Sequence, residues 1–381
     1  MSNEPPIFLD MQSTTPVDRR VLDAMFPYFM EEFGNPHSAE HDYGHRAAAA
    51  IEEALGRLAE VIGARGADIT LTSGATESNN LALRGLVPVG KRAHFIASAI
   101  EHRSVLGTFE ALERDGHAVT LLPVDSEGLV AVESVESALR SDTVLVSIMT
   151  ANSEIGVIQP VAAIAALCRS HDVPFHTDAS QAYGKLNIDV ERDGIDLMSF
   201  SAHKVYGPKG IGALYVRDAI RKRIQPQITG GSQQNGLRAG TIPTPLAVGF
   251  GEAAVLAVQE REAGAAHVLA LRDLFVETLE AKVGSVTING STRHRLPGNL
   301  NLRIDGVDAD SLLYMVRQVA FSTGSACSSG ALEPSAVLLA LGLSREQAAS
   351  SFRVGFGRTN TAAEVIRAAA LLGDAVARLR A

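Results

Sequence analysis

Hydrophobic residues recur with two different spacings along the first part of the chain. Residues 47–62 carry apolar side chains at a helical spacing, whereas residues 69–72 (ITLT) are typical of a short strand. The alternation continues with predicted helices at 74–85, 104–114, 132–140 and 160–171, and with predicted strands at 94–98, 118–123, 143–150, 173–177, 195–200 and 212–216. Such alternation favours an α/β fold around a parallel sheet, where ligands bind beyond the strand ends.

The pattern changes after residue 245. A long helical run rich in Ala and Glu ends near residue 283, and predicted strands follow near 286 and at 299–304 and 352–355, before a last helix from 361. This order predicts a second, smaller α+β domain. We expect residues 15–258 to form the large domain and residues 1–14 and 259–381 the small one, with the boundary inside the long helix near 259–264.

Composition narrows the classes of function. The chain has 381 residues, of which 46% are hydrophobic, enough for a large core. Its 34 basic and 43 acidic residues give a net charge of -9, which argues against direct nucleic-acid binding. Two cysteines and a polar start unlike a signal peptide predict a cytoplasmic protein. The most apolar long stretch, 245–258, contains Glu252 and is too short to span a membrane.

Lys204 is the first candidate for chemistry, because it follows a predicted strand and lies among apolar residues. Burial disfavours the ammonium form, and a neutral lysine forms imines with aldehydes and ketones. The nearby Ser201 hydroxyl and His203 imidazole suit an anion such as a phosphate ester. The alternative is a lysine that reaches solvent from a strand, and this segment alone leaves both interpretations open.

Three other segments place polar groups after predicted strands. Residues 73–80 open a helix, so their backbone N–H groups and the Thr76 hydroxyl either bind a phosphate or cap the helix. Asp178 is either a structural cap or the partner of a buried cation such as a pyridinium nitrogen. His102 either stacks on a flat ring or is an ordinary loop histidine. Together with Lys204, these features describe a site for pyridoxal 5'-phosphate.

Six segments together resemble those of the NifS/IscS-type cysteine desulfurases of the class V aminotransferases. They are residues 73–78 (SGATES), 152–156 (NSEIG), 178–181 (DASQ), 201–210 (SAHKVYGPKG), 238–241 (RAGT) and 325–328 (SACS), and the match runs from about residue 9 to 358. The resemblance implies the type I fold of pyridoxal phosphate-dependent transferases. In that fold the large domain has a mostly parallel seven-stranded sheet, and a smaller α+β domain accompanies it.

The resemblance also implies a role for each matching residue. Lys204 corresponds to the lysine that binds the cofactor covalently, Asp178 to the partner of the ring nitrogen, Gln181 to the partner of the ring hydroxyl, and His102 to the stacking histidine. The residues that match the cofactor's phosphate-binding segments are Ala75, Thr76, Ser201, His203 and Thr241. Thr241 would reach the cofactor of a neighbouring subunit, which implies a homodimer. Asn152 and Arg353 correspond to the groups that hold the substrate carboxylate.

Cys327 determines the reaction that the resemblance implies. It lies in a segment of small and polar residues, 321–330, whereas burial as a small hydrophobic side chain is the interpretation that fits Cys168. L-cysteine would be converted to L-alanine, and the Cys327 thiolate would take the sulfur as a persulfide and pass it to an acceptor protein. Lys204 is the expected base for the α-proton, and His102 is a candidate for proton transfer at the thiol.

Several alternatives stay open. The sulfur could serve iron–sulfur cluster assembly, tRNA thiolation or DNA phosphorothioation, and the end of the chain just after its last helix favours the last. A catalytically silent scaffold, a selenocysteine lyase and a transaminase are the other candidate functions. Residues 10–14 (DMQST) and 232–235 (SQQN) depart from the family pattern. His37, His41 and His45 are spaced like metal ligands, but Pro36 and Gly44 interrupt a helix there, so we expect a polar loop near the site entrance and no metal.

Overall fold

A seven-stranded sheet forms the centre of the computed structural model, which describes residues 6–323 and 334–381. Its strand order is β2-β8-β7-β6-β5-β3-β4. The strands are β2 (Ile69–Thr72), β3 (His94–Ser98), β4 (Ala118–Leu122), β5 (Thr143–Ser147), β6 (Phe175–Asp178), β7 (Leu197–Ser201) and β8 (Gly212–Val216). All neighbours are parallel except β8, which is antiparallel to β2 and β7. The predicted mostly parallel, seven-stranded sheet is therefore confirmed.

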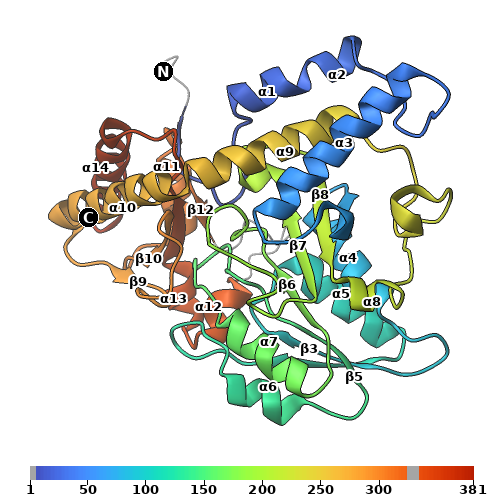
Figure 1. The fold of residues 1–381 in the computed structure, drawn as a ribbon. Helices are drawn as coiled ribbons and strands as arrows, with labels where there is room; N and C mark the ends of the chain where they lie inside the picture. The colour runs from blue at the N-terminus through green and yellow to red at the C-terminus, as the bar shows by residue number, and fades with distance from the viewer. Residues whose placement is uncertain (1–5, 324–333) are drawn as a thin grey trace.

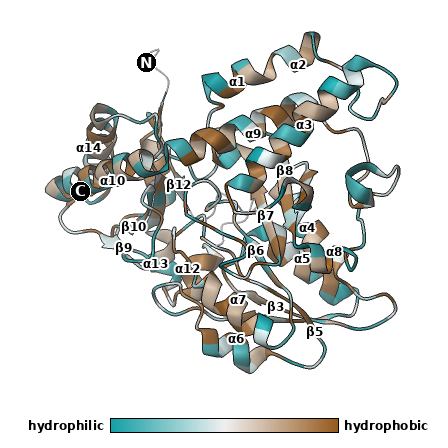
Figure 2. Cartoon of the chain, in the orientation of Figure 1, coloured by the Kyte–Doolittle hydropathy of each residue, from teal (hydrophilic) through white to brown (hydrophobic). Residues whose placement is uncertain are grey.

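Helices cover both faces of this sheet because its strands are apolar on both sides. Leu214 and Tyr215 are neighbours in β8, yet they belong to different core clusters, as expected for side chains that alternate between faces. One face packs on α4 (Ala75–Gly85) and α5 (Arg103–Arg114), and the other on α3 (Asp42–Glu60), α6 (Val132–Ala138), α7 (Val161–Ser170) and α9 (Thr244–Gln259). Figure 2 shows hydrophobic and hydrophilic bands alternating along the outer helices, as a one-sided core contact requires.

The C-terminal part of the chain builds a separate core around a four-stranded antiparallel sheet, β12-β13-β10-β9. Its elements are β9 (Thr287–Ile288), β10 (Asn299–Arg303), β12 (Ser322–Thr323), β13 (Ser351–Gly355), α10 (Arg261–Val283), α11 (Ala309–Met315), α12 (Ala336–Ala340), α13 (Arg345–Ala349) and α14 (Ala362–Leu379). Near the N-terminus, β1 (Ile7–Phe8) pairs with β11 (Val319–Ala320) and joins this core. Figure 1 shows this part on the left, beside the central sheet.

The structure corrects several predicted elements. The long helix after residue 245 is two helices, α9 and α10, which meet at Glu260. The sequence did not predict α1 (Arg19–Met25), α2 (Pro27–Met30) or α8 (Asp218–Arg221), and Gly44 lies inside α3 instead of interrupting a helix. His41 caps α3 through a bond from the Gly44 N–H. The division into residues 15–258 and the remainder stays a prediction, which the separate cores support.

Candidate active site

A cavity of about 560 Å³ opens at the carboxyl ends of the central strands. Segments far apart in the sequence line it, and nine of the predicted site residues are among them: Ala75, Thr76, His102, Asp178, Gln181, Ser201, His203, Lys204 and Arg353. The structure therefore brings most of the predicted site together. The physical cause is the parallel sheet, which gathers the ends of β2, β3, β6 and β7 at one edge.

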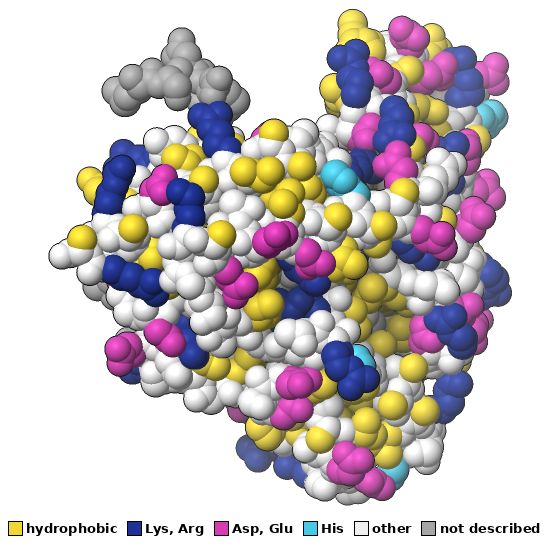
Figure 3. All heavy atoms as spheres, turned by 90° about the vertical axis from the view of Figure 1, so that its left-hand side faces the viewer, with side chains coloured by type: hydrophobic (Ala, Val, Ile, Leu, Met, Phe, Trp, Pro, Cys, Tyr) yellow, Lys and Arg dark blue, Asp and Glu magenta, His cyan; other side chains and the backbone are white. Residues whose placement is uncertain are grey.

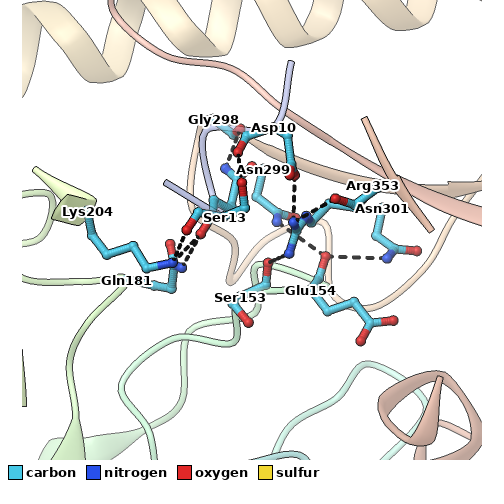
Figure 4. A network of polar contacts seen from close by, with 12 residues as sticks. Asp10, Ser13, Ser153, Glu154, Gln181, Lys204, Gly298, Asn299, Asn301 and Arg353 are labelled. Carbon is cyan, nitrogen blue, oxygen red and sulfur yellow. Dashed lines mark hydrogen bonds and ion pairs between the residues drawn. The ribbon is translucent and has the colours of Figure 1, made fainter. Parts of the chain in front are cut away.

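Lys204 lies in the connection between β7 and β8, at the end of a short 3₁₀ helix, Ala202–Lys204. This connection is too short for a helical crossover, which explains why β8 runs antiparallel to β7. The Lys204 Nζ donates to the carbonyl oxygens of Gln12 and Ser13, at 2.7 Å each (Figure 4). A segment near the N-terminus thus meets the lysine inside the cavity.

Asp178 ends β6 and accepts three hydrogen bonds. Its Oδ1 accepts from the Ser180 N–H at 2.9 Å and the Ser180 hydroxyl at 2.6 Å, and its Oδ2 accepts from Asn79 Nδ2 at 2.8 Å. These three bonds fix the plane of the carboxyl group. Asn79 also donates to the Ser104 hydroxyl at 2.9 Å. The sequence reasoning missed Asn79, although it lies within the quoted segment 73–80.

His102 begins the next strand-end loop and caps α5. Its Nδ1 accepts the Ser104 N–H at 3.1 Å and lies 2.8 Å from the Ser104 hydroxyl. This arrangement leaves the ring open to the cavity that it lines. Burial, with the positive charge of Lys204 as a further cause, lowers the pKa of His102, so its ring is neutral near pH 7.

The other end of the cavity suits an anion. Ala75 and Thr76 lie in the first turn of α4, whose N-cap Gly74 offers no side chain to the helix amides. Ser201 and His203 approach from the β7 side, and the His203 Nδ1 lies 3.0 Å from the Thr14 hydroxyl. Burial and the charge of Lys204 lower the pKa of His203 to about 4. His203 therefore acts as a neutral hydrogen-bonding group here.

Arg353 reaches the cavity from β13 and is held on several sides. Its Nη2 contacts Asp10 Oδ1 at 2.6 Å and the Ser322 hydroxyl at 3.1 Å, and its Nη1 donates to the Ser153 carbonyl at 3.0 Å (Figure 4). The Nε is buried without a hydrogen-bond partner among the described residues. A fixed guanidinium beside the cavity can bind a carboxylate. Asp10 was not among the predicted site residues.

Two predicted site residues among the described ones, Asn152 and Thr241, do not line the cavity. Asn152 is buried, and its side chain bonds to the backbone of Ile100, Glu154 and Ile155. Thr241 is exposed and lies outside the cavity lining. Cys327 lies outside the described residues. The other cysteine, Cys168, is buried in α7, and burial raises its pKa to about 12, so the structure gives it no thiolate character near pH 7.

Basic and acidic side chains are mixed on the surface that Figure 3 shows, where Lys and Arg are interspersed with Asp and Glu. In the part of the chain that the structure describes, no group of three or more His, Cys, Asp or Glu side chains is arranged to hold a metal ion. Across residues 6–323 and 334–381, no helix combines the length and the apolar character that crossing a bilayer requires.

The chain belongs to the class-V aminotransferase family, whose model matches residues 7–367. It is 47% identical to the cysteine desulfurase IscS of Rickettsia bellii over 377 residues, covering 98% of this chain and 92% of that protein. A solved NifS-like protein matches with a TM-score of 0.91 and 34% identity, covering 98% of this chain and 100% of that one. SspA in complex with cysteine matches with a TM-score of 0.83 and 39% identity, covering 93% and 100% of the two chains.

These comparisons confirm the predicted class of protein. The chain has the fold of the class-V aminotransferases and is a pyridoxal phosphate-dependent enzyme of the cysteine desulfurase type.

Proposed function

We propose that the cavity binds pyridoxal phosphate and L-cysteine, and that Lys204, Asp178, His102 and Arg353 carry out the binding and proton transfers there. The observation that supports this proposal is the convergence of an amine, a carboxylate, an imidazole and a guanidinium from four separate segments on one cavity. The residues fit the cofactor because the first turn of α4 suits a phosphate and the fixed carboxyl group of Asp178 suits a pyridinium nitrogen. Bound pyridoxal phosphate supplies an electron sink for removal of the substrate α-proton.

The side chains that line the cavity bind the substrate and transfer its protons. Arg353 holds the substrate carboxylate and thereby orients the substrate in the cavity. Lys204 is the proposed carrier of the α-proton, because its amine lines the cavity and an amine can act as a general base. His102, neutral near pH 7, accepts the thiol proton. Contact of Asn152 with the substrate carboxylate stays a proposal; the bonds of its amide to three backbone groups fix the loop that carries it.

Cys327 is the proposed sulfur acceptor. Its thiolate forms an S–S bond to the substrate sulfur as the substrate's Cβ–S bond breaks, and the carbon skeleton takes up protons and leaves as alanine. The resulting persulfide then transfers its outer sulfur to a thiol of an acceptor protein. A pull-down with the persulfide form identifies whether that acceptor belongs to iron–sulfur assembly or to thio-modification. The cytoplasmic location stays a prediction.

A homodimer is the proposed assembly. Four exposed apolar side chains follow one another on α1, α2 and the next loop: Phe26, Phe29, Met30 and Phe33, with exposed fractions of 58%, 56%, 68% and 64%. An apolar group of this size on a surface is typical of a protein contact. Thr241 does not line the cavity of its own chain, which leaves it to contact the phosphate of a second copy.

The test is a comparison of three proteins loaded with pyridoxal phosphate. The unsubstituted protein should show a visible absorption band and release alanine from L-cysteine. Lys204→Ala should lose both, whereas Cys327→Ser should keep the band and lose sulfur transfer to a thiol. Absence of the band in the unsubstituted protein would indicate a silent scaffold. Undiminished sulfur transfer by Cys327→Ser would overturn the role of Cys327, and amino transfer to a keto acid without sulfur release would indicate a transaminase.

A further inference from the structure

A second lysine lies beside the first, outside the set of residues discussed so far. Lys185 follows the turn after β6 and is half-buried. Its Nζ donates to the Gln181 Oε1 at 3.4 Å. It lines a second cavity of about 120 Å³, and both Lys204 and Gln12 line this cavity and the active-site cavity. Lys185 therefore lies directly behind the active site.

The bonds of Gln181 depend on which way its carboxamide points. Its Nε2 donates to the Gln12 carbonyl at 2.8 Å, and the same carbonyl accepts from Lys204. A carbonyl oxygen only accepts, so Gln12 requires the NH₂ end of the carboxamide, and the oxygen end is left to accept from Lys185. The reverse orientation would place two oxygens against each other and would lose both bonds. The second N–H of Nε2 is left for a ligand in the cavity.

The groups around Lys185 include both signs of charge. Lys204 and the neutral His203 approach from the β7–β8 connection, and Glu260, Arg261 and Arg358 also line the second cavity. Glu260 is already paired with Arg20 and Arg358, at 2.7 and 2.6 Å. In the described part of the chain, Lys185 forms no ion pair with a carboxylate. Burial and the charge of Lys204 lower the pKa of Lys185 to about 7.

We propose that Lys185 is a positioning residue for the cofactor ring: it fixes the Gln181 carboxamide with an N–H toward the cavity and places a second lysine side chain beside Lys204. This inference rests on the proposed function. Both effects favour a negative ring oxygen and disfavour an extra proton on the nitrogen that joins Lys204 to the cofactor. Losing Lys185 therefore makes that nitrogen more basic.

The test is a pH titration of the visible absorption band of the protein loaded with pyridoxal phosphate. Lys185→Met should raise the midpoint by about one pH unit, a tenfold change in proton affinity. Lys222→Met is the matched control, because Lys222 is exposed and lines neither of the two cavities. Its midpoint should stay at the unsubstituted value. An unshifted midpoint in Lys185→Met overturns the inference, whereas no band in the unsubstituted protein defeats the proposed function instead.

Two further variants test the route through Gln181. Lys185→Arg keeps a cationic donor and should restore a midpoint close to the unsubstituted one, while a midpoint equal to that of Lys185→Met counts against the inference. In a Gln181→Leu background, Lys185→Met should shift the midpoint by less than it does alone. Equal shifts in both backgrounds would overturn the action through Gln181. If Lys185→Met does not fold, Lys185→Gln takes its place with the same expected direction.

Discussion

Arg353 is positioned by an aspartate that lies more than three hundred residues before it in the sequence. Asp10 contacts its Nη2 at 2.6 Å, and the two side chains are 14% and 8% exposed. Such a pair holds the guanidinium in one orientation, at the cost of a carboxylate close to the proposed substrate carboxylate. The role of Asp10 is therefore to orient the Arg353 guanidinium, and the negative charge of Asp10 itself does not help to bind the substrate carboxylate.

Asp10→Ala should raise the KM for L-cysteine by about tenfold, because Arg353 loses the contact that orients it. Asp10→Asn keeps an oxygen that accepts from Nη2 and should have a smaller effect. The visible band of the bound cofactor should not change in either variant. Asp23→Ala is the control, since Asp23 is 59% exposed and pairs with Arg19 on the surface. An unchanged KM in Asp10→Ala would show that Arg353 needs no such support.

Glu101 offers a test of the electrostatics beside Asp178. It is buried, its Oε1 accepts from the Ser98 hydroxyl and the Met149 N–H at 2.7 and 2.8 Å, and its Oε2 has no hydrogen-bond partner among the described residues. Burial is the main cause that raises its pKa from 4.5 to about 8. The native state therefore keeps a proton that the unfolded chain loses between these two values, and stability falls as the pH rises through this window.

Glu101→Gln removes that loss, because a carboxamide does not titrate. We compare the free energies of unfolding of the variant and the unsubstituted protein, both without cofactor. The difference in favour of the variant should grow between pH 5 and pH 8, by at most about 1.4 kcal/mol per pH unit. Urea unfolding at several pH values measures this difference. Glu110→Gln, an exposed surface change, should show no such trend. A constant difference across the pH range would mean that Glu101 is ionised in the native state.

At the scale of elements, β8 lies close to the start of α4, where we propose that the cofactor phosphate binds. A Cβ on Gly212 would lie 2.7 Å from the Gly74 backbone and 2.8 Å from the Phe200 carbonyl oxygen. These are backbone atoms, so they cannot move aside as a flexible side chain does. Gly212 thus permits β8 and the backbone of Gly74, just before α4, to lie against each other.

Gly212→Ala should lower the free energy of unfolding by ~1–3 kcal/mol, as overpacking in a tight core does. It should also weaken binding of pyridoxal phosphate, because the first turn of α4 is displaced. Denaturant unfolding and titration of the cofactor band measure the two effects. Gly107→Ala in α5 is the control, since a Cβ there meets nothing within 4 Å. Normal cofactor affinity in Gly212→Ala would show that the loop adapts.

Elements with a strong local pattern were predictable from the sequence. β2, β3 and β8 begin and end where the apolar runs do. By contrast, α1 and α2 were missed because their exposed Phe26, Phe29 and Met30 do not follow the pattern of a core-facing helix. Because ligands bind beyond the ends of parallel strands, the sequence predicted that Lys204, Asp178 and His102 meet, and all three line one cavity. By contrast, Asn79, Asp10 and Lys185 depend on side-chain contacts that only the folded arrangement defines.

At the scale of the whole molecule, α1 and α2 lie at the outer edge of the fold, above α3 and α9 (Figure 1). Leaving Phe26, Phe29, Met30 and Phe33 in water is unfavourable, and contact with a second copy would remove them from it. The same contact would bring Thr241 toward another chain's site. Assembly and cofactor binding should therefore be linked.

The double substitution Phe29→Ser and Phe33→Ser should convert a dimer into a monomer, because it removes two aromatic side chains per copy from the proposed contact between the copies. Sedimentation equilibrium measures the mass, and dilution of the loaded protein measures how readily pyridoxal phosphate is lost. The monomer should lose the cofactor faster if Thr241 contacts the partner's phosphate. Tyr314→Ser is the control, since Tyr314 is 72% exposed on α11, outside this surface. A dimer that survives the double substitution would place the contact elsewhere, and a monomer that retains its cofactor would show that each site is complete within one chain.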